Sequence, residues 1–168
     1  YVKIAPTSKV TVNYGTSELA NKEITVVKGE TLSLETPEIN GYECIGWYNE
    51  DTLETAFDFS TPITEDITIY AKWVVAYDIW VAGIRFNVEN LIIDDNDDST
   101  ITGTATYDAV NNILTLDNFS YAGAGYLYDD YINNSAIIFG KNELTVKLVG
   151  TSVIEATEDR CSGIVSYD

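Results

Sequence analysis

Residues 41–48 read GYECIGWY and residues 67–73 read ITIYAKW, and these two stretches decide the fold. In both, apolar residues recur at every second position, which is the pattern of a half-buried β-strand. Gly41 and Gly46 allow a turn and a close backbone approach beside the large indole of Trp47. We expect Trp47 and Trp73 to anchor a small core, because aromatic side chains supply much of the buried area of a small domain.

Two more alternating segments precede this pair. Residues 10–14 and 24–27 predict strands, and the polar residues between them are typical of a hairpin connection. Five short blocks then follow in order: GY at 41–42, GWY at 46–48, FDF at 57–59, TPIT at 61–64 and IYAKW at 69–73. Together they closely resemble the Listeria–Bacteroides repeat of bacterial surface proteins, over about residues 9–73. The resemblance implies a four-stranded, β-grasp-like module, which we assign to residues 1–75.

The second half of the chain, residues 76–168, shows an internal echo. Leu114-Thr115-Leu116 returns as Leu144-Thr145-Val146, and Ala136-Ile137-Ile138 returns as Gly163-Ile164-Val165. The spacing of about 27–30 residues is typical of solenoid coils, in which each β-rung buries its inner face only against a neighbour. With the YDIWVAG stretch at 77–83, the pattern resembles the start of the right-handed parallel β-helix of many bacterial surface and carbohydrate-binding proteins. The expected fold class is therefore mainly all-β, with the first coils of a truncated β-helix in residues 76–168.

A solenoid that stops after a few coils leaves an open apolar end. For this end we expect either an end-to-end dimer or capping by the first module. The link Val74-Val75-Ala76 is short and apolar rather than rich in Gly and Ser, which predicts that the two modules touch.

The composition is strongly acidic, with 27 acids, 9 bases and a net charge of −18. Such a surface repels phosphate backbones, so nucleic acid is not an expected partner. No apolar run is long enough to span a bilayer, and no signal peptide is present. Met is absent, so we interpret the chain as a piece of a longer, exported precursor located outside the cell or at the bacterial cell surface.

The inventory of catalytic groups is poor. Without His, the Ser-His-Asp and Cys-His arrangements cannot be built. No phosphate-cradling glycine loop occurs, and acids are so numerous that a pair of carboxylates carries no information. Cys44 and Cys161 lack CxxC partners, and we expect two free, buried thiols. The chain is therefore expected not to be an enzyme.

A run of carboxylates interrupts the second half, and it is the one candidate for a metal site. Calcium takes six to eight oxygen ligands, and a dense Asp loop can supply several of them. The EF-hand pattern fails here, because Ser99 occupies the place of the turn glycine. The alternative is a solvated acidic loop, which is the usual state of a charge run. The calcium candidates are Asp94, Asp95, Asp97 and Asp98.

A tyrosine-rich segment is the candidate for ligand binding. Tyrosine rings offer flat apolar faces to a sugar, carboxylates accept hydrogen bonds from its hydroxyls, and the same composition also serves protein contacts. The alternative is a loop whose rings pack on the outer β face. The candidates are Tyr121, Tyr126, Tyr128, Tyr131, Asp129 and Asp130.

These features lead us to expect a non-enzymatic, secreted adhesin fragment of the bacterial cell surface. The repeat would act as a spacer, and the β-helix would present a surface to a glycan or to a host or matrix protein, gaining avidity from repetition. Two alternatives stay open: a non-catalytic portion of a carbohydrate-active β-helix enzyme, and a purely structural stalk. No cofactor is expected apart from the candidate calcium.

Overall fold

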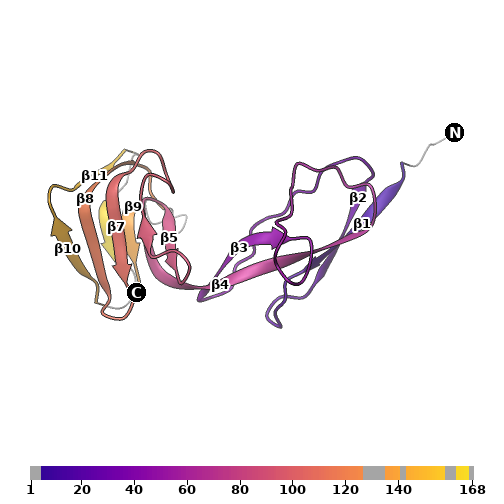
Figure 1. The fold of residues 1–168 in the computed structure, drawn as a ribbon, viewed down its shortest axis with the longest axis horizontal. Coiled ribbons are helices and arrows are strands. Elements are labelled where there is room, and N and C mark those ends of the chain that lie inside the picture. The colour runs from indigo at the N-terminus through magenta and orange to yellow at the C-terminus, as the bar shows by residue number, and fades with distance from the viewer. Residues whose placement is uncertain (1–4, 127–134, 141–142, 158–161, 167–168) are drawn as a thin grey trace. The chain divides into compact units, whose positions relative to one another are not determined.

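The computed structural model describes residues 5–126, 135–140, 143–157 and 162–166, and every regular element in them is a β-strand. The expected all-β fold class is confirmed, since these residues contain no helix. The chain divides into two compact units, Tyr1–Val74 and Val75–Asp168, each described here by itself (Figure 1). β4 (Ile67–Val81) runs through the boundary as one strand, so the expected link Val74-Val75-Ala76 is part of a strand.

The first unit is a mixed sheet built on a parallel pair. β1 (Thr7–Asn13) lies parallel to β4, with Val10 opposite Ile67 and Val12 opposite Ile69. The long stretch between them provides the crossover that a parallel pair requires. β2 (Lys22–Val27) pairs antiparallel with β1, and β3 (Tyr42–Tyr48) pairs with β4. β2 forms one edge of this sheet.

The core of the first unit lies on one face of this sheet. Val10 and Val12 alternate with exposed or half-buried neighbours along β1, and both are fully buried. Trp47 is buried, and its ring meets Tyr14 edge-to-face at 5.7 Å. Trp73 packs against the same cluster, and its indole N–H donates to the carbonyl of Tyr14 at 2.8 Å. Both tryptophans therefore anchor this core, as the sequence predicts.

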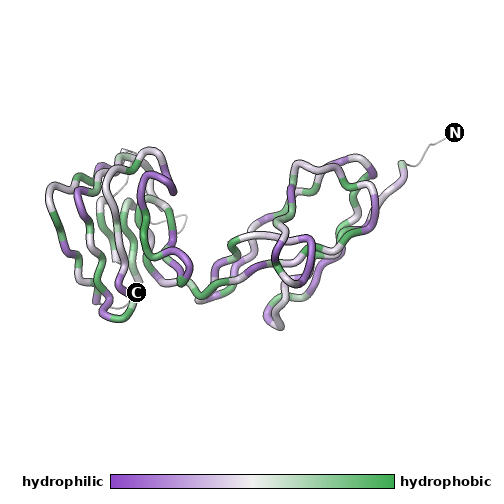
Figure 2. Tube along the Cα trace, viewed as in Figure 1, coloured by the Kyte–Doolittle hydropathy of each residue, from purple (hydrophilic) through white to green (hydrophobic). Residues whose placement is uncertain are grey.

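The second unit places two groups of strands around a second core. Alternation of apolar and polar residues along these strands is visible in Figure 2. One group follows the order β10-β8-β7-β6, with β11 also on β8, and the other consists of β5, β9, β12 and the last part of β4. The strands are β5 (Ile84–Asn87), β6 (Ile92–Ile93), β7 (Thr102–Asp108), β8 (Ile113–Gly123), β9 (Ser135–Phe139), β10 (Thr145–Val149), β11 (Val153–Ala156) and β12 (Ser162–Ser166).

The last strands of the second unit stack parallel on earlier ones. β12 lies parallel to β9, with Ile164 opposite Ile137, so the predicted pairing of residues 136–138 with 163–165 is confirmed. β10 and β11 both lie parallel to β8. There Val146 faces Leu114, so the echo of 114–116 in 144–146 is wrong by two residues. The strands β10, β11 and β12 thus follow the same course as β8 and β9, one strand further along the sheets.

The predicted β-helix is not confirmed, because the sheets do not close and do not form the stacked coils of a solenoid. β7 and β8 pair antiparallel through the short turn at residues 109–112, and β4 pairs antiparallel with both β5 and β9. The short connections between β4 and β5 and between β7 and β8 reverse the chain, whereas each parallel pair needs a long return path. The described residues of the second unit therefore form mixed sheets in which only β10, β11 and β12 pair parallel with earlier strands.

Candidate functional site

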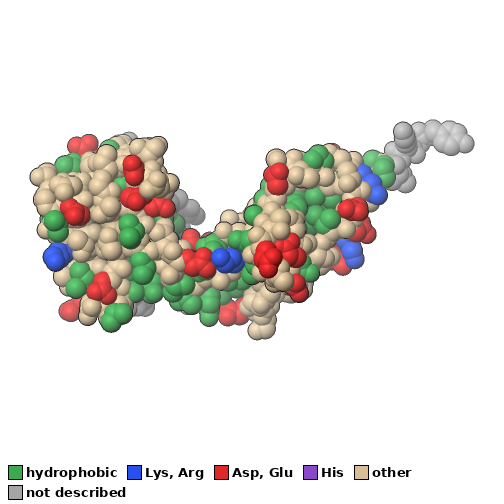
Figure 3. Space-filling model, in the orientation of Figure 1, with side chains coloured by type: hydrophobic (Ala, Val, Ile, Leu, Met, Phe, Trp, Pro, Cys, Tyr) green, Lys and Arg blue, Asp and Glu red, His purple; other side chains and the backbone are tan. Residues whose placement is uncertain are grey.

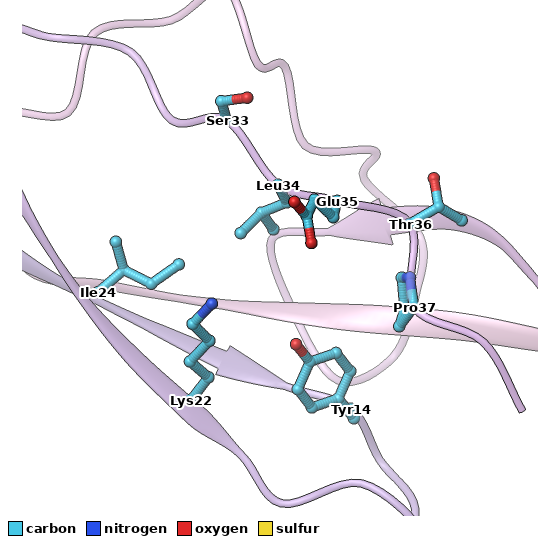
Figure 4. A pocket seen from close by; sticks show the side chains of 8 residues that line it. All are labelled: Tyr14, Lys22, Ile24, Ser33, Leu34, Glu35, Thr36 and Pro37. Carbon is cyan, nitrogen blue, oxygen red and sulfur yellow. The ribbon is translucent and has the colours of Figure 1, made fainter.

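A groove of about 440 Å³ opens on the first unit, between β2 and the extended residues 33–37 (Figure 4). Lys22 and Ile24 sit on the edge strand β2, opposite the core residues Val12 and Val10 of β1. The groove therefore lies at the edge of the sheet, between β2 and residues 33–37. Its lining consists of Tyr14, Lys22, Ile24, Ser33, Leu34, Glu35, Thr36 and Pro37.

The groove has a mixed lining that is more polar than apolar and carries charges of both signs. Ile24 and Leu34 are half-buried and pack against the core of the unit. The Lys22 amine, the Tyr14 hydroxyl and the Glu35 carboxylate are all labelled around the opening in Figure 4. These groups can donate and accept hydrogen bonds to a ligand whose other face is apolar. The sequence analysis missed this groove, because its two walls come from segments that are separate in the sequence.

The acidic loop after β6 uses its carboxylates to hold its own turns. Asp94 Oδ1 accepts the backbone N–H and the side-chain amide of Asn96, at 2.8 and 2.9 Å. Asp97 Oδ2 accepts the backbone N–H of Asp94 at 3.1 Å. Such bonds are typical of Asx turns, in which a short side chain replaces a backbone acceptor.

The rest of this loop follows the same pattern. Asp98 Oδ1 accepts the backbone N–H and the hydroxyl of Thr100, at 2.8 and 2.9 Å, and these bonds hold the pKa of Asp98 below its usual range. Asp95 is exposed. Within the described ranges, no three Asp, Glu, Cys or His side chains come together in a group that could hold a metal ion. The calcium site stays a prediction.

Only two of the predicted ligand-binding residues are described, and both are engaged in packing. Tyr121 is buried in the core of the second unit, and its hydroxyl accepts the backbone N–H of Gly125 at 3.0 Å. Tyr126 is half-buried and stacks on Trp80, with ring centroids 4.8 Å apart. The other candidates, Tyr128, Tyr131, Asp129 and Asp130, lie outside the described residues.

Trp80 also lies beneath a cation. The guanidinium carbon of Arg85 is 4.7 Å from the Trp80 ring centroid, within the range of a cation–π contact. Arg85 donates through Nε to the carbonyl of Tyr77 at 2.9 Å and forms a 3.1 Å ion pair with Asp78. The stack of Tyr126, Trp80 and Arg85 holds together the segment before β9, β4 and β5. Trp80 itself is buried, so the stack presents little open ring surface to a ligand.

Cys44 behaves as a packing residue. Its thiol is free of a disulfide and donates weakly to the carbonyl of Gly46 at 3.7 Å. Burial raises the pKa of the Cys44 thiol, so the neutral form dominates at neutral pH. Cys161 lies outside the described residues.

The comparisons with known proteins agree with the sequence blocks in the first unit. Residues 10–72 match the Listeria-Bacteroides repeat domain. A protein of Evansella cellulosilytica named "Putative membrane protein" is 37% identical over 70 residues, which is 39% of this chain and 10% of that protein. The described residues include no helix able to cross a membrane. The segment of residues 10–72 is thus supported as a Listeria-Bacteroides repeat, and the chain spans a small part of the relative that it matches.

Proposed function

We propose that this chain is a non-enzymatic binding fragment of a bacterial surface protein, acting outside the cell. The observation that carries the proposal is the match of residues 10–72 to the Listeria-Bacteroides repeat domain. The relative's printed name, "Putative membrane protein", supports a place at the cell envelope. Acidic side chains are scattered over the visible faces of both units, with few basic ones, as expected for a surface that stays soluble (Figure 3).

The finer architecture belongs to the same proposal. The first unit, with its parallel β1–β4 pair and the flanking strands β2 and β3, is β-grasp-like. The parallel stacking of β10 and β11 on β8, and of β12 on β9, supports the second unit as the start of a β-helix. In this reading the repeat is a compact module in a longer surface protein, and the second unit begins a solenoid.

The groove between β2 and residues 33–37 is the proposed binding surface. Its lining is more polar than apolar, and Lys22, Tyr14 and Glu35 supply donors and an acceptor to a ligand. Ile24 and Leu34 add a small apolar patch that suits one face of a sugar ring or a small side chain. A single shallow groove binds weakly, and repeated modules on one surface would raise the overall avidity.

The test is binding of the purified chain to a glycan array and to immobilised host matrix proteins. The expected result is saturable binding that falls by about tenfold or more in a Lys22→Ala, Glu35→Ala variant, since a good hydrogen bond to a charged group is worth about 1.5–3 kcal/mol. The matched control is Lys28→Ala, Glu30→Ala, which removes the same charges from an exposed turn outside the groove.

Two results would overturn the proposal. One is silence on both arrays, which would leave the chain as a structural spacer. The other is turnover of a polysaccharide by the chain itself, which would favour a carbohydrate-active enzyme. Binding that both double variants retain would remove the groove from the proposal and leave another surface responsible.

A further inference from the structure

The edge strand β2 of the first unit turns part of its backbone away from the sheet. β2 ends its sheet order, and β1 is its partner strand in the described residues. One step beyond their register, the N–H of Lys28 donates to the carbonyl of Pro6 at 2.9 Å. Bonded and non-bonded pairs alternate along an antiparallel ladder, so the even-numbered residues of β2 bond to β1, whereas Glu23 and Thr25 turn their N–H and C=O outward. Among the residues that the structure describes, none bonds these outward groups, which we call the free edge of β2.

The sequence of β2 leaves the free edge open to pairing. Natural edge strands usually carry charges or proline that prevent an added strand from pairing. The charges of β2 are confined to its first two residues, and residues 24–27 read ITVV, without charge or proline. One of these charges, on Glu23, already forms a 2.9 Å ion pair with Lys9 of β1. The β-branched side chains of residues 24–27 favour the extended conformation that pairing needs.

The groove lies beside the free edge. Lys22 and Ile24 alternate with the two free-edge residues along β2, so their side chains share one face of the strand, and there they line the groove (Figure 4). A strand added at the free edge would bring its own side chains on that face to within about 5.5 Å of them, between Cβ atoms. These side chains would enter the groove and meet the apolar patch of Ile24 and Leu34. The free edge and the groove are thus two parts of one surface.

The charges around this surface favour a basic partner. The Glu35 carboxylate lines the groove, and within the described ranges no hydrogen bond or ion pair engages it. Residues 18–38 hold five glutamates and two lysines, a net charge of −3: Glu18, Glu23, Glu30, Glu35 and Glu38 against Lys22 and Lys28. A negative surface of this kind attracts and orients a ligand that carries basic groups.

We infer that the free edge and the groove together bind an extended polypeptide segment, which adds to the sheet as a strand beside β2. One apolar side chain of this segment packs against Ile24 and Leu34, and a lysine or arginine lies near Glu35. This partner class deepens the proposed function and rests on it, because the groove is the same. An extended backbone matches the outward N–H and C=O groups of a strand edge, whereas a sugar ring does not. In such pairing the main-chain hydrogen bonds supply affinity, and pockets for alternate side chains supply specificity.

The test is an NMR titration of the chain with the capped heptapeptide acetyl-Thr-Lys-Thr-Val-Thr-Lys-Thr-amide, up to roughly 2 mM, a range that covers weak binding. The valine and both lysines of this peptide share one face of a strand, and its symmetric order suits either strand direction. The expected result is saturable binding. A matched peptide with glutamate in place of both lysines should bind about threefold or more weakly, and Glu35→Gln should remove most of this difference.

Thr25→Pro tests the free edge itself. Proline removes the outward N–H and blocks an added strand, yet it is tolerated on an edge strand whose N–H faces solvent. This variant should bind the lysine peptide at least about tenfold more weakly. The control is Asp51→Pro, which changes an exposed residue at the second position of the turn from Glu50 to Leu53, where proline is favoured. The control variant should bind the peptide as the unchanged chain does.

Amide hydrogen exchange in the unchanged chain makes the test independent of the folding of any variant. The amides of Glu23 and Thr25 should exchange rapidly in the free chain and about fivefold or more slowly when the lysine peptide saturates it. The amides of Ile24 and Val26, which bond to β1, should change little. Peptide binding without this slowing, or no binding of the lysine peptide, contradicts the added strand.

Failure of the added strand is distinct from failure of the proposed function. Binding on the glycan array that falls in Lys22→Ala, Glu35→Ala and is unchanged in Thr25→Pro would keep the groove as a sugar site and overturn the added strand alone. Silence on both arrays, together with no binding of the lysine peptide, would overturn both.

Discussion

Ser8 is a polar residue buried among the apolar side chains of the first unit. Ser8 lies on the same face of β1 as Val10 and Val12 and is almost fully buried. Among the residues that the structure describes, none forms a hydrogen bond with its hydroxyl. A buried hydroxyl without a partner loses its hydration and gains nothing in return. At this position the side chain therefore costs stability.

Ser8→Ala is expected to raise the free energy of unfolding by about 1 kcal/mol, because it removes the unsatisfied hydroxyl and keeps the methylene in place. Urea unfolding followed by tryptophan fluorescence measures the change. Ser33→Ala is the control: Ser33 is exposed beside the groove, and its loss should change stability by less than about 0.5 kcal/mol. A destabilised Ser8→Ala would mean that the hydroxyl has a partner after all.

Several exposed carboxylates act as turn acceptors, and Asp58 is the clearest. It accepts the hydroxyl and the backbone N–H of Ser60, at 2.7 and 2.8 Å, and the hydroxyl of Thr61 at 3.1 Å. The hydrogen bond from the Ser60 side chain is the main cause that holds the pKa of Asp58 below its usual range. Asp108 has its pKa lowered in the same way, chiefly by the Asn111 side chain.

A lowered pKa in the folded state gives a definite pH dependence. The contribution of Asp58 is fully present above the unfolded pKa of about 3.9 and is lost as pH falls through the lower folded value. Asp58→Asn should therefore be destabilised relative to the unchanged chain at neutral pH, and the difference should vanish in strong acid. The measurement is urea unfolding across this pH range.

Removing any negative charge from a chain of net charge −18 relieves repulsion, so this comparison needs a matched control. Asp51→Asn removes one charge from an exposed turn of the same unit. The change in the free energy of unfolding caused by Asp58→Asn should be compared with the change caused by Asp51→Asn. A difference between the two variants that persists unchanged into strong acid would contradict the turn-acceptor role.

At the scale of elements, two asparagines hold the parallel strand β10 against β8. Asn112 and Asn118 flank the paired part of β8, and both have left-handed backbones, with φ of 53° and 46°. The Asn112 side-chain amide donates to the carbonyl of Glu143, just before β10. Asn118 Oδ1 accepts the backbone N–H of Thr151 at 3.3 Å, just after β10. The strand is thus tied at both ends by side chains of its neighbour.

Asn118→Ala is expected to lower the free energy of unfolding by about 2 kcal/mol, because alanine tolerates the left-handed backbone less well than asparagine and because the hydrogen bond is lost. Asn118→Gly separates the two causes. It has no left-handed strain, so it should lose only about 1 kcal/mol. Thermal or urea unfolding measures both variants. Equal stability of Asn118→Ala and the unchanged chain would show that this corner does not hold β10.

In the second unit, the sequence predicts one of the parallel pairings and misses the register of another. The pairing of β9 with β12 follows directly from the echo of apolar residues. The register of β10 on β8 does not, because a shift of two residues keeps every side chain on its face. Asn118 also bends β8, so that Leu116 and Phe119 both point inward despite a spacing of three. This change of phase buries Tyr121, which the sequence analysis named as a ligand candidate because of the tyrosine-rich composition of its segment.

At the scale of the whole molecule, the chain has two separate hydrophobic cores, one in each unit. The first unit encloses a core around Trp47, and the second encloses one around Phe86, Phe119 and Leu114. Strand patterns predict the all-β class, and the repeat follows from the resemblance of the five sequence blocks. They do not predict the groove, because it depends on how the extended residues 33–37 lie over β2. Packing between distant segments decides such a surface, and a local pattern does not record it.

The central claim is that the second unit stacks its last strands parallel on earlier ones. Solution NMR of the 18.6 kDa chain tests it most directly, through cross-strand nuclear Overhauser effects. The account predicts contacts of Ile137 with Ile164 and of Leu114 with Val146, in the pattern of parallel strands. Antiparallel contacts among these segments, or none between β9 and β12, would contradict it.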